Sequence, residues 1–116
     1  MAEGLNTAGI QVGAAAIAAD INKIRLHTAS PEASSGTANL TTAADKTVAC
    51  TASNGVVTVP STNFTGGAAG GAATHVSFWN GANYRGYDSL AGDQAFNAAG
   101  EYTVTGVTIS GTSSAV

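Results

Sequence analysis

The stretch Thr74–Ile109 constrains the fold most, because it places a strand, a tight turn, a second strand and a long return strand in direct succession. Residues 74–79 alternate, with Val76 and Phe78 on one predicted face, and the sequence NGAN at 80–83 then turns the chain back. Short alternating runs separated by turn residues are typical of antiparallel hairpins. The sequence therefore predicts a domain built mainly from β-strands.

Two further segments support this prediction. Lys46–Ala52 alternates, Asn54-Gly55 supplies two residues that tolerate positive φ, and Val56–Pro60 continues as a strand, which together predict a hairpin. The closing strand is expected over Glu101–Ser110. Its apolar residues change faces halfway along, and a bulge at Gly106 would restore a single apolar face.

The N-terminal segment has a helical period. Isoleucines and one alanine recur at spacings of four, three, four and three, which places them on one stripe of a helix: Ile10, Ala14, Ile17, Ile21 and Ile24. The stripe is expected to dock on the domain's own sheet. The alternative is a contact between identical helices in an oligomer, so Ile10, Ile17, Ile21 and Ile24 are candidate partner-binding residues.

These elements predict a small antiparallel β-sandwich preceded by an α-helix. All 116 residues are expected to form a single domain, with the helix over 5–24, the sandwich over 25–110 and a C-terminal tail over 111–116.

Composition argues against several functions. Ala, Gly, Ser and Thr supply 64 of the 116 residues, so large apolar side chains are few and stabilisation by assembly is expected. Four basic residues against seven acidic ones cannot form the basic face that nucleic-acid binding needs. The apolar N-terminal run is interrupted by Gly13 and Asp20, so neither a signal peptide nor a membrane span is expected.

Catalytic and metal-binding patterns are not found. Cys50 has no second cysteine to pair with and is expected to act as a small apolar group in a strand. The acidic residues are spread singly, and the closest pair, Asp88 and Asp93, is too sparse for a calcium loop. A dyad of His27 or His75 with Cys50 or a serine has no support in the spacing. We expect no catalytic residues, no metal ligands and no cofactor.

Aromatic residues surround the turn at 80–83. Trp79 and Tyr84 could stack on sugar rings if both were exposed on one concave patch, so they are candidate partner-binding residues. The competing interpretation places them in the core.

Two sequence elements resemble a known family. Residues 75–79 read His-Val-Ser-Phe-Trp and are followed by a short turn, a glycine-containing strand and the Glu-Tyr-Thr-Val-Thr segment at 101–105, while residues 26–31 read Leu-His-Thr-Ala-Ser-Pro after the helix. In this order they resemble small virion proteins of tailed bacteriophages that infect actinobacteria. The Gly/Ala-rich loop 65–73 departs from the longer Pro-Ala-Gly loop of that family.

The resemblance implies a virion structural protein on the particle surface, assembled in the host cytoplasm. A capsid decoration protein is the first expectation, with the major capsid protein as partner, because the chain is one compact module without a shaft. It implies a homo-oligomer, with a trimer expected. The alternative is a tail or fibre component that binds tail proteins or surface glycans.

Overall fold

The computed structural model describes residues 7–92 and 94–110 of the chain. It contains one α-helix and nine short strands among these residues: α1 (Thr7–Asp20), β1 (Lys23–His27), a 3-10 turn η1 (Ala33–Gly36), β2 (Lys46–Thr47), β3 (Thr51–Ser53), β4 (Val56–Thr58), β5 (Thr62–Phe64), β6 (His75–Asn80), β7 (Asn83–Ser89), β8 (Tyr102–Val104) and β9 (Thr108–Ser110). The predicted class, mainly β with an N-terminal helix, is confirmed.

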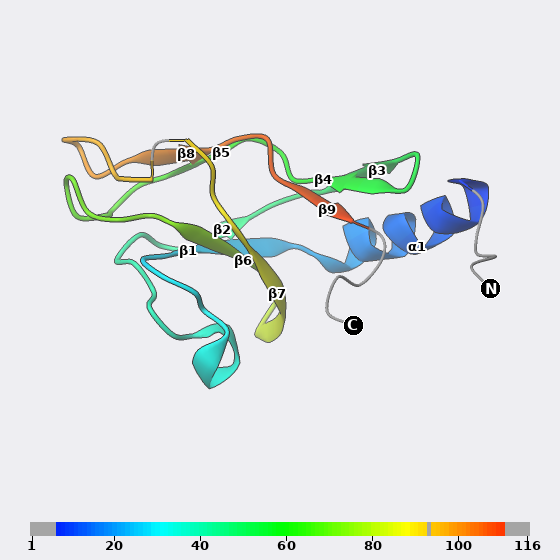
Figure 1. Cartoon of the computed structure of the whole chain (residues 1–116), viewed down its shortest axis with the longest axis horizontal. Helices are drawn as coiled ribbons and strands as arrows, with labels where there is room; N and C mark the ends of the chain where they lie inside the picture. Colours follow the sequence, from blue (N-terminus) through cyan, green and yellow to red (C-terminus); the bar gives the residue numbers. More distant parts are fainter. Residues whose placement is uncertain (1–6, 93, 111–116) are drawn as a thin grey trace.

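The described strands form three antiparallel sheets. The largest has the order β2-β1-β6-β7, a second has the order β3-β4-β9, and β5 pairs with β8. Figure 1 shows β5 and β8 above the four-stranded sheet, and β3, β4 and β9 extending toward α1. The chain is elongated, with extents of 49 × 26 × 26 Å.

The main core lies between the four-stranded sheet and the other strands. Leu26 and Val76 project from paired positions on β1 and β6, and they share one buried cluster with Phe64 of β5 and Val104 of β8. The cluster also contains Ile21, Ile24, Val48, Val59, Ala73, Phe78, Leu90, Phe96 and Val107. The side chains of Val76 and Phe78, which were predicted to share one face, therefore both point into this core.

Helix α1 packs on β3 and β4, so the expectation that it docks on the domain's own sheet is confirmed. Gln11 ties the two together: its side-chain amide donates to the Ala52 carbonyl at 3.2 Å and accepts from the Gly55 amide at 2.7 Å. A Cβ on Gly55 would lie 2.5 Å from the Ile10 side chain, so this close approach requires glycine.

The helix is shorter than the sequence predicted. It ends at Asp20, and Ile24 lies on β1 with its side chain in the main core. The prediction of a helix to residue 24 was wrong because the four-three spacing continues by chance into a strand, where the pairing of Ile24 with Phe78 takes over.

The predicted hairpin at Asn54-Gly55 is confirmed. Ser53 pairs with Val56, and the two turn residues have φ values of 52° and 81°. The strand before it differs from the prediction, because Lys46–Ala52 is split: β2 pairs with β1, and the chain then crosses to the other layer through Val48 and Cys50 before β3 begins.

The closing strand is likewise divided into β8 and β9, which belong to different sheets. Gly106, with φ of 70°, lies in the break and permits the change of faces, so Val104 and Val107 are both buried. The prediction of a bulge at Gly106 within one continuous strand was wrong. Instead, the residues before and after Gly106 pair in two separate sheets, and this accounts for the change of face of the apolar residues.

The pairing register between β6 and β7 shifts by one residue within β7. Phe78 pairs with Gly86 but Trp79 pairs with Tyr84, so Arg85 is the extra residue of a β-bulge. Because of this bulge Tyr84 and Tyr87 lie on the same face of the sheet, although three positions separate them.

Candidate functional site

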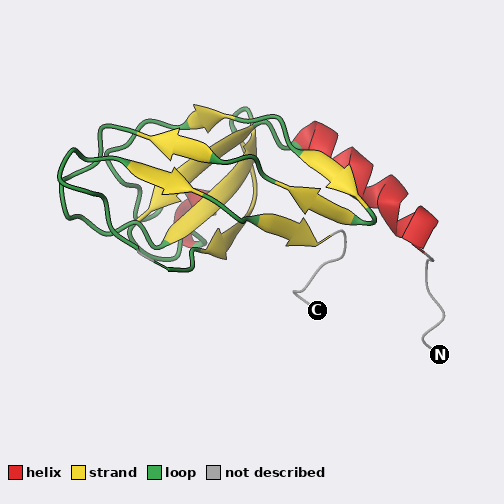
Figure 2. Cartoon of the chain, turned by 90° about the horizontal axis from the view of Figure 1, so that it is seen from above, coloured by secondary structure: helices red, strands yellow, loops and turns green. Residues whose placement is uncertain are grey.

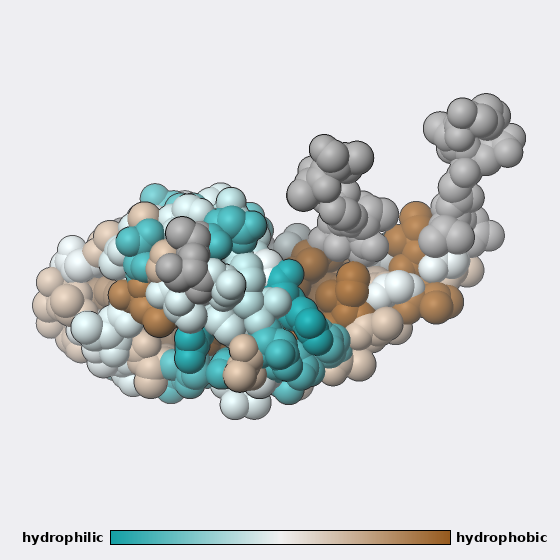
Figure 3. All heavy atoms as spheres, turned by 90° about the horizontal axis from the view of Figure 1, so that it is seen from below, coloured by the Kyte–Doolittle hydropathy of each residue, from teal (hydrophilic) through white to brown (hydrophobic). Residues whose placement is uncertain are grey.

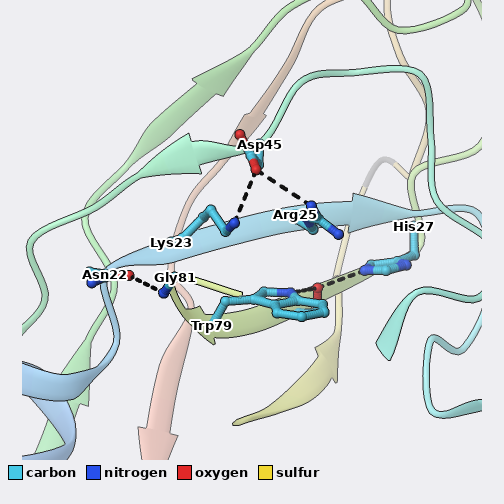
Figure 4. Close-up of polar contacts among 8 residues, drawn as sticks. Asn22, Lys23, Arg25, His27, Asp45, Trp79 and Gly81 are labelled. Atoms are coloured by element: carbon cyan, nitrogen blue, oxygen red, sulfur yellow. Dashed lines mark hydrogen bonds and ion pairs between the residues drawn. The ribbon is translucent and has the colours of Figure 1, made fainter. Parts of the chain in front are cut away.

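The outer face of the four-stranded sheet, away from the main core, carries a dense polar and aromatic cluster (Figure 4). Antiparallel pairing of β1 with β6 brings Lys23 opposite Trp79, Arg25 opposite Ser77, and His27 opposite His75. Strand alternation puts all six of these side chains on one face. We call this set, together with Tyr84, Tyr87 and Asp45, the outer-face cluster.

A chain of hydrogen bonds runs through the centre of the cluster. Trp79 Nε1 donates to Ser77 Oγ at 2.7 Å, and Ser77 Oγ lies 2.6 Å from His27 Nε2 (Figure 4). His27 Nδ1 lies 2.9 Å from the Ala38 carbonyl, which can only accept. Neutral His27 therefore carries its proton on Nδ1, and Nε2 accepts from the Ser77 hydroxyl.

Burial fixes the charge state of this histidine. His27 and Ser77 are both 0% exposed. Loss of hydration disfavours the imidazolium and lowers the pKa of His27, outweighing the opposite effect of the Ala38 hydrogen bond, while the positive charge of Arg25 lowers it further. The neutral, Nδ1-protonated form is the one that satisfies every partner.

The Ser77 and His27 pair has the distance of a nucleophile and its base, but not the surroundings of one. Neither side chain is exposed, so a substrate cannot reach Ser77 in this conformation. The group that orients His27 is a backbone carbonyl rather than a carboxylate, which would stabilise an imidazolium. The arrangement is suited to holding the loop at Ala38 against β1 and β6.

The positive charges lie over the indole ring. The Arg25 guanidinium carbon is 4.8 Å from the Trp79 ring centroid and Lys23 Nζ is 5.8 Å from it. The Asp45 carboxylate pairs with both cations, 3.3 Å from Lys23 and 3.7 Å from Arg25, and balances one of the two positive charges (Figure 4). The rim of the cluster is thus internally paired.

Tyr84 closes the other side of Trp79. Its ring centroid is 5.3 Å from that of Trp79, and its hydroxyl donates to the Glu32 carboxylate at 2.7 Å. Burial and the neighbouring Glu32 raise the pKa of Tyr84. A Cβ on Gly36 would collide with the Tyr84 ring, so the η1 turn lies directly against it. The loop after β1 therefore covers this part of the sheet.

The predicted aromatic pair is brought together but does not form an open platform. Trp79 is only 4% exposed, and Tyr84 is half-buried under Glu32 and Gly36. Sugar stacking needs an exposed ring face, which Trp79 does not offer. The glycan-binding alternative thereby loses the exposed pair on which it depended, and Tyr87, which is 42% exposed, is the more accessible aromatic residue on this face.

The isoleucines are divided between two places. Ile21 and Ile24 are buried in the main core, whereas Ile10 and Ile17 are partly buried on α1. Ile17 and Ile21 line a groove of about 530 Å³ with Ala16, Asp20, Phe78, Arg85 and Ile109. An ion pair at 2.7 Å between Arg85 and Asp20 forms its polar rim and raises the pKa of Arg85.

Other candidate residues have structural surroundings. Cys50 is partly buried against the core, and this burial raises the pKa of its thiol. His75 is a strand-face residue with Nδ1 2.8 Å from the Thr74 hydroxyl. Asp93 lies outside the described residues, so the Asp88 and Asp93 pair is not described.

Within the described ranges, no three His, Cys, Asp or Glu side chains gather as metal ligands would. Across the same ranges, no helix is both long and apolar enough to cross a bilayer.

Sequence reasoning missed the Trp79-Ser77-His27 chain. Alternation put Val76 and Phe78 on one face of their strand, and therefore His75, Ser77 and Trp79 on the other. The missing information was the pairing of two strands about 50 residues apart, which no local signal contains.

Comparison of the chain with protein-family models, with curated proteins and with solved structures finds no match.

Proposed function

We propose that this protein is a non-enzymatic structural component of a tailed-phage particle, and that it binds the head surface as a capsid decoration protein. The proposal starts from the two elements that resemble small virion proteins of actinobacterial phages, at residues 26–31 and 75–79. It assigns the protein to the virion surface, after assembly in the host cytoplasm, with the major capsid protein as partner.

One observation carries the proposal furthest. The two resembling elements, although distant in the sequence, are hydrogen-bonded neighbours: β1 pairs with β6, and His27 of the first element bonds to Ser77 of the second. Side chains of both elements thus contribute to one packed unit. A resemblance confined to two unrelated loops would give weaker support.

The distribution of charge fits a protein partner. Lys23, Arg25 and Arg85 are paired with two aspartates, Asp45 and Asp20, so two of the four basic charges are balanced in these ion pairs. Little positive charge is left to hold phosphates, which supports the absence of a nucleic-acid partner. A weakly charged, Thr- and Ser-rich surface suits a contact that depends little on ionic steering.

The role also requires self-association. Few large apolar side chains are available, and a closed homo-oligomer would cover apolar surface that this small core cannot bury. The resemblance gives a trimer as the first expectation. A tail or fibre role is the alternative.

The test is direct binding to phage heads. Purified protein is mixed with heads that lack decoration and, separately, with purified tails, at low and high ionic strength. We expect saturable binding to heads that changes little with salt, because the contact is largely uncharged. Binding to tails alone would contradict the decoration role, and a steep loss with salt would contradict the uncharged contact.

A further inference from the structure

One segment crosses the outer face of the four-stranded sheet. Residues 28–40, which include η1 and which we call the strap, leave β1 after His27 and form an antiparallel bridge with that strand again at Leu40. Figures 1 and 2 both place η1 on this side of the sheet, away from α1. Figure 3 shows the same side, with hydrophilic and weakly polar residues over the sheet and hydrophobic residues gathered toward the α1 end. The Trp79 ring, only 4% exposed, lies beneath this cover.

Few contacts hold the strap in place. At its ends, the Thr28 amide donates to the Asn39 carbonyl at 2.8 Å. The Thr41 amide, just beyond the strap, donates to the Leu26 carbonyl at 3.0 Å. Of the strap side chains that the structure describes, only Pro31 is buried. Because segments with few buried apolar groups open at lower free energy than core strands, the strap can detach while the main core remains folded.

His27 joins the strap to the sheet. Its side chain is 0% exposed and both ring nitrogens are bonded, Nδ1 to the Ala38 carbonyl of the strap and Nε2 to the Ser77 hydroxyl of β6 (Figure 4). In this pattern the Ser77 hydroxyl donates to His27 and accepts from Trp79 Nε1. These groups are all satisfied only while the histidine is neutral, because an imidazolium has no acceptor to offer.

A proton on His27 Nε2 would disturb this pattern. The nitrogen would become a second donor to the Ser77 oxygen, and the Ser77 hydroxyl hydrogen would lose its acceptor. Among the described residues, that hydroxyl is bonded to His27 and Trp79 alone. A buried hydroxyl without an acceptor and a buried charge without a counter-ion are both costly. Water can satisfy both groups only if the strap lifts.

The charged groups around His27 increase this cost. Loss of hydration lowers the pKa of His27 most, the hydrogen bond from the strap opposes it, and the charges of Arg25 on β1 and His75 on β6 lower it further. Glu32 of the strap accepts instead from a tyrosine hydroxyl, and Asp45 pairs with Arg25 and a lysine. Both carboxylates are therefore bonded to other groups.

We propose that the strap is a pH-sensitive cover: a proton on His27 favours detachment of residues 28–40 from the outer face, which uncovers the rings of Trp79 and Tyr84 while the main core stays folded. Neutral His27 closes the strap, and the imidazolium is accommodated in the open form, where water reaches it. This device goes beyond the proposed role on the phage particle and does not depend on it.

Proton linkage sets the size of the effect. In the open form His27 is hydrated and titrates near the usual pKa of about 6.5, whereas the closed form excludes the proton. Above pH 6.5 the histidine is neutral in both forms, so the opening equilibrium is independent of pH. Below pH 6.5 only the open form takes up the proton. The opening constant should therefore rise by up to about ten-fold between pH 7.5 and 5.5.

Hydrogen exchange followed by NMR measures this opening in the intact protein. The reporters are the amides of Thr28 and Thr41 and the indole N–H of Trp79, which gives a single resonance because the chain has one tryptophan. After correction for intrinsic exchange rates, all three protection factors should fall together, by up to about ten-fold, from pH 7.5 to pH 5.5. Protection that stays constant at the three reporters would overturn the proposal.

Low concentrations of urea separate opening of the strap from unfolding of the whole chain. Detachment of the strap exposes little surface, so the protection of its reporters should change little with urea. The Val59 amide, bonded to the Val107 carbonyl in the other layer, should follow global unfolding and lose protection steeply. Equal protection and equal urea dependence at Val59 and the strap would also overturn the proposal, because His27 would then take up its proton only on complete unfolding.

Two histidine variants identify the titrating group. His27→Gln supplies one donor and one acceptor but cannot take up the proton, so the difference in protection between pH 7.5 and 5.5 should vanish. His75→Gln changes the residue paired with His27 on β6 and is the matched control, in which the difference should remain. A pH dependence retained in His27→Gln would assign the effect to another group and overturn the proposal.

A third variant tests whether η1 belongs to the segment that opens. Tyr84→Phe removes the hydrogen bond from the Tyr84 hydroxyl to Glu32, a contact of the strap that does not involve His27. Protection of the strap reporters should fall a few-fold at both pH values, with the ratio between the two pH values unchanged. Unchanged protection in this variant would place η1 outside the opening segment and contradict the uncovering of the two rings.

Discussion

The four-stranded sheet and the α1 end of the molecule are covered differently. The four central residues of β6 are buried on both faces, by the main core on one side and by the loop after β1 on the other. In β3 and β4 the alternate residues are exposed, and α1 covers one face. The four-stranded sheet, which we call the body, is therefore buried on both faces, whereas the strands at the α1 end, which we call the helix end, are covered on one face.

This comparison indicates which region supplies stability and which region would gain from association. The outer-face cluster uses its polar groups internally, through the Trp79-Ser77-His27 chain and the Asp45 ion pairs, so the body needs no partner to satisfy them. The α1 end leaves apolar side chains in water. The body therefore supplies the fold, and the helix end is the region that gains from assembly.

The largest expected effect is a difference in unfolding free energy between a side-chain truncation in the body and one at the helix end. Leu26→Ala removes a side chain that is 1% exposed and should lower the free energy of unfolding by about 3 kcal/mol. Ile10→Ala removes a partly buried side chain at the helix end and should cost about 1 kcal/mol. Urea unfolding of both variants measures the difference, and equal losses would contradict the division.

A smaller effect is expected from pH. The pKa of His27 is lowered in the folded state from its usual 6.5, so above pH 6.5 it is neutral in both states and adds no pH dependence. Below pH 6.5 the unfolded chain takes up a proton that the folded chain excludes. The free energy of unfolding should therefore fall by up to about 1.4 kcal/mol per pH unit until the lowered pKa is reached.

Variants separate this histidine from its neighbours. His27→Gln should remove the fall in stability below pH 6.5, whereas His75→Gln, on the adjacent strand and partly exposed, should retain it. Urea titrations at several pH values provide the comparison. The same slope in His27→Gln would show that another group is responsible.

The smallest effect concerns the crossing between the two regions. Cys50 lies between β2 of the body and β3 of the helix end and packs partly against the core. Cys50→Ser should cost about 1 kcal/mol in unfolding free energy, because a hydroxyl is harder to bury than a thiol. Head binding should be unchanged. Loss of binding in a variant that remains folded would give Cys50 a role in the contact.

Sequence patterns predicted the structure correctly where neighbouring residues alone determine the conformation. The Asn54-Gly55 turn and the turn at 80–83 need positive φ or tight geometry, and the structure forms two-residue loops at both. The predictions failed where one run of residues pairs with two different distant segments. The runs 46–52 and 101–110 read as single strands, but each is divided between two sheets.

The candidate site shows the same limit. Alternation identified which side chains share a face with Trp79, but not that a loop from residues 30–40 would cover them. The exposure of Trp79 and Tyr84 depended on Glu32, Gly36 and Ala38, whose positions relative to β6 are set by strand pairing. Burial of an aromatic ring is a property of its neighbours and cannot be read from its own sequence position.

The sequence by itself determined the mainly β class, the N-terminal helix and two hairpin turns, because periodicity and turn chemistry are properties of neighbouring residues. Tertiary structure alone decided the Ser77 to His27 bond, the division of two strands, the bulge at Arg85 and the apolar outer face of α1. These depend on which segments meet, and the free energy that selects the pairing is spread over the whole core rather than held in any one segment.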